Sequence, residues 1–329
     1  MTQWNLGIDM GSLNVRSVTQ DGTVLAQSSA VSLRKGEAFA FGEEALRLAE
    51  RTAFSMETGY PYENGALGNE QYFSLWMRRL LGQMPRGRAR VLFACPSRMS
   101  LYEKRHTAAL IMQSGAADCA FVSAETAALL GSGRDILSDE CAMVCDIGAG
   151  HIACAAIAGG KILHGAQIPY GIREADRAIV RLCGDKHHMS VSLAQAEEVK
   201  KTLSSVKGLS MSVKGLSRVS GFPCECTVSS EDAAEAVAPI VKETLRLIRS
   251  ALDTLSPECL EDLTLSGITL TGGGAQAAHL EEQTAAETHL PVQTASECEN
   301  ACVRGLHAIL TDEKYLSLVQ DYESVMKSE

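Results

Sequence analysis

Two carboxylates lie at the ends of apolar segments, and a glycine-bearing turn follows each of them. Asp9 lies in Gly7-Ile-Asp-Met-Gly11, and Asp146 opens Asp146-Ile-Gly-Ala-Gly150. Backbone N–H groups that point inward from such a turn bind phosphate oxygens, and a carboxylate beside them suits Mg²⁺. Either motif alone is also a common way to end a strand. Because the plan occurs twice, it predicts two turns that hold one nucleotide triphosphate between two halves of the chain.

A third glycine-rich stretch follows a later apolar segment. Gly272, Gly273 and Gly274 come after a predicted strand over 266–271 and directly before a predicted helix over 275–288. Three glycines let the backbone approach a flat or anionic ligand closely. A tight turn without a ligand is the alternative for this stretch taken singly.

The elements that must position these turns occur in two similar sets. In each half a strand reaches the carboxylate, a second strand leaves the turn, and a hairpin leads to a third, over 6–31 and 141–168. Helices and strands then alternate, which predicts an α/β protein built by domain duplication, with the repeat near residue 140. Helices are predicted at 43–51, 72–81, 101–114, 125–130, 174–182, 193–203 and 233–255, the last kinked or restarted at Pro239.

The length, composition and net charge of the chain limit the kinds of protein that it can be. The 329 residues are 46% hydrophobic, enough for a large core divided between two or so domains. The formal charge of -10 and the 5% aromatic content argue against a nucleic-acid partner, since neither a basic face nor a stacking platform is indicated. No apolar run approaches the roughly 20 residues that a membrane span requires.

The eleven cysteines are scattered, and many lie within apolar runs. This usage is typical of reduced core residues in a cytosolic protein. Cys224 and Cys226 lack a second His/Cys pair at zinc spacing, as do Cys298 and Cys302, so we do not expect a zinc site.

The order of these motifs resembles the actin-like ATPase superfamily and, within it, the bacterial actin MreB family. The three glycine motifs carry the superfamily resemblance. The MreB-like segments are Phe41-Gly-Glu-Glu-Ala45 with Arg51-Thr52, Tyr102-Glu-Lys-Arg105, Ala196-Glu-Glu-Val-Lys200, and Val219-Ser-Gly-Phe-Pro223 with Thr227-Val-Ser-Ser-Glu231. The likeness extends over roughly residues 5–310.

The resemblance implies an α/β actin-like ATPase fold, with two ribonuclease-H-like domains around a nucleotide cleft. Domain I would span 1–137, with a small subdomain at about 33–70. Domain II would span 138–311, with a small subdomain at about 177–240. The tail over 312–329 would pack back on domain I.

The resemblance also implies ATP, or GTP, with Mg²⁺ as the bound cofactors. Asp9 would act on the metal through water, with Asp146 as the second catalytic carboxylate. The nucleotide contacts implied are Gly11, Ser12, Leu13 and Asn14 in the first turn, Gly148, Ala149 and Gly150 in the second, Glu197 and Lys200 one helical turn apart, and Gly272, Gly273, Gly274 and Ala275.

The chain departs from the family where a glutamate would orient the attacking water. Ala124 stands there, and Glu125 is the candidate replacement, although one residue on a helix is a rotation of about 100°. A positioned general base contributes about 10²- to 10⁴-fold in rate, so slow hydrolysis is expected. His151 and Ile152 also replace threonines, and Ile172-Arg173 replaces a Gly-Asp pair.

The function implied is that of a cytoplasmic, filament-forming protein of cell shape or cell-wall organisation. Its partners would be further copies of itself and cell-wall or division proteins. Two alternatives stay open: a catalytically degenerate actin-like scaffold that binds protein partners, and a small-molecule kinase on the same core. The basic loop 85–88 and Trp4 suggest weak membrane contact at most.

Overall fold

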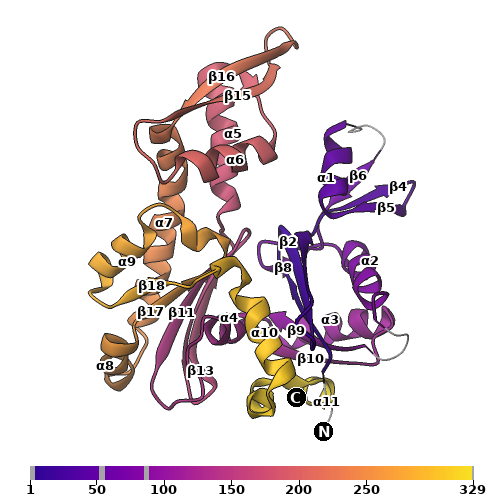
Figure 1. The fold of residues 1–329 in the computed structure, drawn as a ribbon, viewed down its shortest axis with the longest axis vertical. Coiled ribbons are helices and arrows are strands. Elements are labelled where there is room, and N and C mark those ends of the chain that lie inside the picture. Colours follow the sequence, from indigo (N-terminus) through magenta and orange to yellow (C-terminus); the bar gives the residue numbers. More distant parts are fainter. Residues whose placement is uncertain (1–3, 52–55, 85–88, 328–329) are drawn as a thin grey trace.

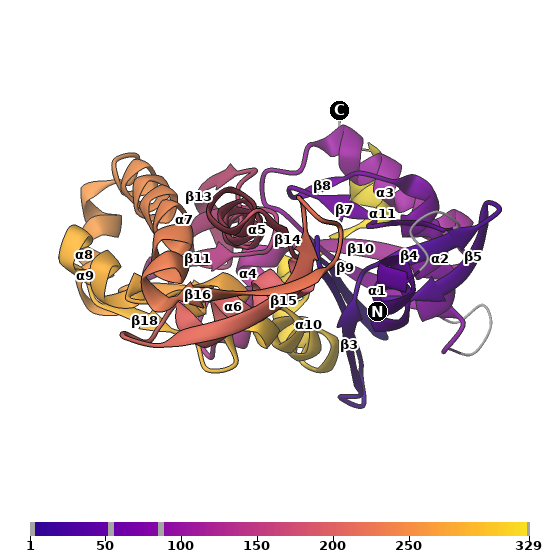
Figure 2. The ribbon, with the colours of Figure 1, turned by 90° about the horizontal axis from the view of Figure 1, so that it is seen from above.

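The computed structural model describes residues 4–51, 56–84 and 89–327. Figure 1 shows two halves side by side, each with a large sheet in its lower part and a smaller subdomain above it. The view from above in Figure 2 shows the helices packed around these sheets. This arrangement places the predicted turns between the halves.

Each half is built on one mixed sheet, and the two sheets have matching strand orders. The first has the order β19-β10-β9-β1-β2-β3 and the second β13-β12-β11-β17-β18. In both, three antiparallel strands are followed by two parallel ones, which confirms the predicted repeat. Their bounds are β1 Leu6–Met10, β2 Asn14–Thr19, β3 Val24–Ser28, β9 Arg90–Cys95, β10 Asp118–Ser123, β19 Gln320–Asp321, β11 Ala142–Ile147, β12 Ile152–Ala158, β13 Lys161–Ile168, β17 Ile268–Thr271 and β18 Val292–Thr294.

Local sequence signals start the helices that cover these sheets. Ser100 caps α3 (Leu101–Gln113) in a capping box with Glu103, and Asn69 caps α2 (Glu70–Leu81). The apolar side chains of α2 include the fully buried Phe73 and Trp76, which join the core of the first sheet. The second sheet is covered in the same way by α7 (Ser230–Leu252) and α8 (Pro257–Ser266).

Two short helices cross between the halves with their backbones in contact. These are α4 (Ala124–Gly131) and α10 (Ala301–Thr311). A Cβ on Gly131 would overlap the carbonyl oxygen of Ala301, and a Cβ on Gly305 would overlap that of Ala127. Glycine at both places therefore allows an approach that no other residue permits.

The crossing helices are exchanged between the halves. From the first half, α4 packs against β11 and β12 of the second sheet, whereas α10 from the second half packs against β1 and β2. One core cluster accordingly joins Val18 and Leu306 with Val144 and Ala155. The domain ranges expected from the sequence, 1–137 and 138–311, stay predictions; α10 belongs to the second range but packs against β1 and β2 of the first sheet.

Smaller subdomains stand above each sheet. The first contains β4 (Val31–Arg34), β5 (Glu37–Phe41), β6 (Glu57–Gly59) and α1 (Gly42–Arg51), followed by the hairpin β7 (Tyr62–Glu63) and β8 (Ala66–Leu67). The second contains α5 (Arg173–His187), α6 (Leu193–Leu203), β14 (Met189–Ser190), β15 (Ser210–Ser217) and β16 (Pro223–Ser229), with the first turns of α7.

Two predicted helices differ in the structure. The triple glycine leads into the short 3-10 helix η1 (Gly273–Gln276), and α9 (Leu280–Thr288) begins only after a left-handed residue, His279 with φ 58°. The other difference is that α7 runs unbroken through Pro239, whose exposed ring faces solvent while Val237 and Ile240 hold the helix to the core.

The C-terminal segment returns to the first half. After η2 (Cys298–Asn300), α10 and η3 (Glu313–Leu318), strand β19 pairs antiparallel with β10. Helix α11 (Tyr322–Lys327) then buries Val325 in the core of the first sheet.

The expectation of lipid contact through Trp4 is wrong, because this side chain is 5% exposed and packs in the core beside Val18. The basic loop 85–88 and residues 1–3 lie outside the described residues. Within 4–51, 56–84 and 89–327, no helix combines the length and the apolar composition needed to cross a bilayer.

Candidate functional site

The two predicted turns have the same backbone geometry. Between β1 and β2, the N–H of Gly11 donates to the carbonyl oxygen of Asn14 at 2.9 Å. Between β11 and β12, the N–H of Gly148 donates to the carbonyl oxygen of His151, also at 2.9 Å. Two equal four-residue turns therefore face each other from the two sheets.

These turns meet across the gap between the halves. A Cβ on Gly150 would overlap the hydroxyl oxygen of Ser12 and lie 2.9 Å from the backbone nitrogen of Asn64. Ser12 is buried, and its hydroxyl has no hydrogen-bond partner among the described residues. A buried polar group is normally paired, so this hydroxyl is suited to a ligand oxygen.

A cavity of about 540 Å³ opens between the turns, which is within the size range of small-molecule sites. Most of the residues predicted to contact a nucleotide line it. They are Asp9, Gly11, Ser12, Leu13, Asn14, Asp146, Gly148, Ala149, Gly150, Glu197, Lys200, Gly272 and Gly273. The structure thus brings residues from all three glycine motifs and from α6 to one cavity.

The carboxylate of Asp9 lies in a charged environment. Burial raises its pKa, and nearby Asp146 adds to the rise, whereas Arg16 and His151 lower it. Asp146 accepts a hydrogen bond from Thr271 Oγ1 at 2.8 Å, across the parallel pair β11 and β17. Because Thr271 immediately precedes Gly272, this bond ties the second and third motifs together.

Two residues on α6 line the opposite side of the cavity. Lys200 is largely buried, and its ammonium lies 2.7 Å from Oδ1 of Asp176 on α5. Burial raises the pKa of Asp176, and the Lys200 ammonium opposes that rise. Glu197 pairs with the exposed Lys201 at 2.6 Å. The Lys200 ammonium therefore holds α5 against α6 at the cavity wall.

The three consecutive glycines have different positions: Gly272 and Gly273 line the cavity, whereas Gly274 packs against the protein interior. A Cβ on Gly273 would meet nothing within 4 Å, so this backbone faces open space. A Cβ on Gly274 would overlap the Ile147 side chain, and Ala275 is 3% exposed. The structure thus places Gly274 and Ala275 beneath the lining, where they pack against β11, and not on it.

Glu125 is also placed differently from the sequence expectation. Its carboxylate is buried and accepts hydrogen bonds from Ser97 N at 3.0 Å, Ser97 Oγ at 2.9 Å and Ser123 Oγ at 2.6 Å. Ala124, not Glu125, lines the cavity. The helical rotation turns Glu125 into the protein, where it fixes the start of α4, and so it is not placed to act as a base.

Several lining residues were not singled out in the sequence. Arg16 is the cross-strand partner of Asp9 in the β1–β2 pairing, and it could have been found by counting outward from the turn. Gln276 and Glu299 line the wall as a pair joined at 3.0 Å. Gln276 and Glu299 come together only because of the path that the chain takes after the triple glycine. No local sequence signal predicts that path.

The residues present fit a magnesium-bound nucleoside triphosphate. The unpaired Ser12 hydroxyl and the open backbone at Gly273 suit phosphate and a flat base or ribose. Across the described ranges no three His, Cys, Asp or Glu side chains cluster to hold a metal. Asp9 would adjoin a Mg²⁺ ion bound with the phosphates, an ion that usually keeps several waters and substrate phosphates as ligands.

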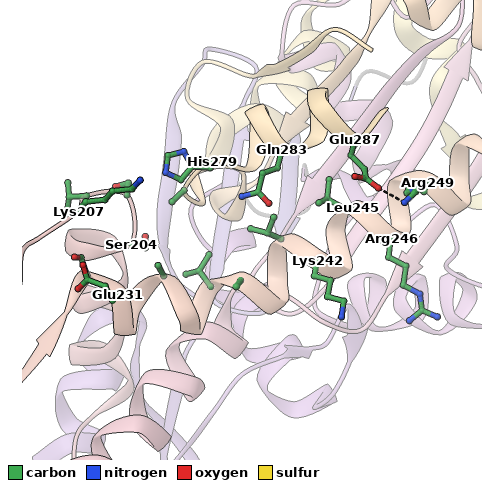
Figure 3. A pocket seen from close by; sticks show the side chains of 18 of the residues that line it. Ser204, Lys207, Glu231, Lys242, Leu245, Arg246, Arg249, His279, Gln283 and Glu287 are labelled. Carbon is green, nitrogen blue, oxygen red and sulfur yellow. Dashed lines mark hydrogen bonds and ion pairs between the residues drawn. The ribbon is translucent and has the colours of Figure 1, made fainter. Parts of the chain in front are cut away.

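A larger hollow of about 980 Å³ lies on the outer side of α7, facing α9 (Figure 3). Its lining includes Lys242, Arg246 and Arg249 of α7, and Arg249 pairs with Glu287 of α9, whereas Lys242 and Arg246 extend away from α9 (Figure 3). It contains neither carboxylate of the paired motifs and none of the glycine turns. The smaller cavity is therefore the candidate functional site.

Known proteins match nearly the whole chain. A family model described as MreB/Mbl protein matches residues 3–317. The cell shape-determining protein Mbl of Bacillus subtilis (strain 168) is 27% identical over 302 residues, covering 88% of this chain and 91% of the relative. A crystal structure of MreB 5 of Spiroplasma citri bound to AMPPNP is 25% identical, with a TM-score of 0.86, covering 93% of this chain and 95% of that one. The MamK double helical filament shares the fold, at 18% identity and a TM-score of 0.77, covering 92% and 97%.

These matches agree with the paired sheets, the two facing turns and the cavity between them. The fold is the actin-like ATPase fold. Since the family model covers 3–317 of the 329 residues, the chain belongs to the MreB/Mbl family.

Proposed function

We propose that this protein binds ATP with Mg²⁺ in the cavity between the turns, turns it over slowly and assembles into filaments. The observation that carries nucleotide binding is the meeting of Ser12 and Gly150, where a buried hydroxyl without a partner among the described residues lies between the two turns that line the cavity. A relative of similar fold is bound to AMPPNP. A titration with fluorescent ATP tests the proposal, and absence of saturable binding would reject it.

Slow hydrolysis is expected because no side chain at the Ala124 position of the cavity wall can orient the attacking water. Asp9 and Asp146 adjoin the turns, but Ala124 offers no group to orient water, and Glu125 is fully engaged by Ser97 and Ser123. The turns hold phosphate through backbone groups, which do not depend on Ala124. Binding should therefore be retained while the chemical step is slow.

We predict that Ala124→Glu raises the rate of phosphate release at saturating Mg-ATP by about tenfold or more, because it places a carboxylate in the cavity wall. Glu125→Gln is the matched variant, since it keeps the shape but weakens the bonds from Ser97 and Ser123. It should lower the melting temperature and leave the rate little changed. A large loss of rate in a well-folded Glu125→Gln protein would instead show that Glu125 is the base.

Self-association is supported by exposed apolar residues at opposite ends of the second half. Phe222 and Val219, at the tip of the β15–β16 hairpin, are 72% and 84% exposed, and Leu265 on α8 is 88% exposed. Figure 1 shows the hairpin at the top and α8 at the bottom. A contact between unlike ends produces an open filament when its rotation does not close into a ring, and a filament is the form in which MamK was solved.

We predict that sedimentation with Mg-ATP increases between low and moderate salt, since salt screens the repulsion of copies with a formal charge of -10. Phe222→Asp should reduce the sedimented fraction severalfold. Val24→Asp, at another exposed apolar residue on the edge strand β3, should not. Equal sedimentation of both variants would remove the hairpin tip from the contact.

Such filaments would act in cell shape, the role that the names of the relatives give, and we place them in the cytoplasm and extend the role to cell-wall organisation as part of the proposal. Partners would then include cell-wall or division proteins. If Ala124→Glu gives no gain in phosphate release although ATP binds, the scaffold alternative, in which nucleotide only stabilises the closed cleft, becomes the better description.

A further inference from the structure

Two basic side chains flank Asp9 within the cavity, one from each half. Arg16 lies directly across the β1–β2 pair from Asp9, and its Nε donates to Asn300 Oδ1 at 3.2 Å. His151 closes the second turn and comes from the other sheet. Both side chains line the cavity, and both act electrostatically on Asp9.

The surroundings of His151 hold its ring at the cavity. A Cβ on Gly65 would lie 2.9 Å from His151 Cγ, so the Asn64-Gly65 turn covers one side of the ring. A Cβ on Gly148 would lie 3.6 Å from its Nδ1. No hydrogen bond to either ring nitrogen is formed by any residue that the structure describes. A histidine donates an N–H in each tautomer, so the ring is available to an oxygen ligand.

Arg16 is suited to the same ligand for a different reason. Its guanidinium is always charged and presents a fork of N–H donors that matches phosphate oxygens. The bond from Nε to Asn300 fixes one edge of the group, and its other N–H donors have no hydrogen-bond partner among the residues that the structure describes. A phosphate bound between the two turns would thus meet the Arg16 guanidinium from the first half and the imidazole N–H of His151 from the second.

We propose that Arg16 and His151 bind the terminal phosphates of the nucleotide, His151 through a ring N–H and Arg16 through its guanidinium, which supplies part of the positive charge that Mg²⁺ would otherwise provide. Nucleotide binding should consequently depend only weakly on Mg²⁺. This inference rests on the proposed nucleotide function and makes a separate statement about how the phosphate charge is neutralised.

The test compares the dissociation constant of fluorescent ATP in saturating Mg²⁺ and in EDTA. Chelation should weaken binding to the parent protein by less than about tenfold, because charge-assisted hydrogen bonds remain. In the double variant Arg16→Gln, His151→Phe, chelation should weaken binding by about 100-fold or more. His151→Phe keeps a ring in the space beside Gly65 but cannot donate.

Two controls separate charge from structure. Arg16→Lys keeps the charge and should retain most of the Mg²⁺ independence. Lys242→Gln removes a cation of α7 that lines the other hollow and not the nucleotide cavity, and it should leave the ratio unchanged. Melting temperatures establish that each variant is folded.

The experiment separates two proposals: that Arg16 and His151 reduce the dependence on Mg²⁺, and that the protein binds a nucleotide at all. A parent protein that binds ATP in Mg²⁺ but loses about 100-fold or more in EDTA overturns the inference and leaves the proposed function standing. The inference is equally overturned if the double variant shows the parent's ratio. Absence of binding in both conditions rejects the nucleotide function, and the inference with it.

Discussion

Replacing Gly273 with valine should weaken nucleotide binding by about 100-fold or more and leave the melting temperature close to that of the parent. The backbone of Gly273 lines the cavity, and a Cβ there meets nothing within 4 Å, so the folded protein has room for the new side chain. The ligand then loses both that space and its close approach to the backbone. Fluorescent-ATP titration and thermal unfolding measure the two effects.

The neighbouring glycine provides the matched control. Gly274→Val adds the same atoms one residue later, where they would overlap Ile147 in the core of the second sheet. This variant should lose melting temperature, and any loss of binding should follow from unfolding. If Gly273→Val binds ATP as tightly as the parent, the nucleotide does not contact this segment and the site assignment fails.

The change Gly305→Ala should destabilise the protein by about 3 kcal/mol or more, the upper range for overpacking a core. The added methyl would overlap the carbonyl oxygen of Ala127, which belongs to the backbone of α4 and cannot rotate away. The helices must then separate, and both sheets are covered by them. Chemical denaturation followed by circular dichroism measures the loss.

Gly273→Ala is the control for that experiment, because it makes the same chemical change where no atom lies within 4 Å. It should change the free energy of unfolding little. A Gly305→Ala protein as stable as this control would show that α4 and α10 can shift apart at no cost, and that the close crossing is not required.

The turns and strands around the site were predictable because their signals are local. Asp9 and Asp146 each end an apolar strand at a glycine, and turn length then fixes the register of the strand that returns. The repeated pattern was enough to predict two matching sheets. Helix α3 after Ser100 was found within a residue, whereas α7 after Ser229 lies three residues earlier than predicted at both ends.

The features that were missed depend on contacts between distant residues. From the sequence, Trp4 is expected to be an exposed aromatic residue near the N-terminus. Its burial becomes evident only from the core cluster that it shares with Val18. Glu125 resembles a candidate base, but its role is decided by Ser97, which only the fold brings near. The break between Gly273 and α9 is likewise set by packing on Ile147, because the local pattern favours a continuous helix.

The exchange of α4 and α10 also constrains how the chain can fold during synthesis. The inner face of the first sheet, with Val18 and Leu92, is covered by α10, which is made near the end of the chain. At a synthesis rate of about 5–20 residues per second, this apolar face stays uncovered by α10 for on the order of ten seconds or more after β10 has been made. The N-terminal half is therefore expected to need protection by a chaperone until α10 has been synthesised.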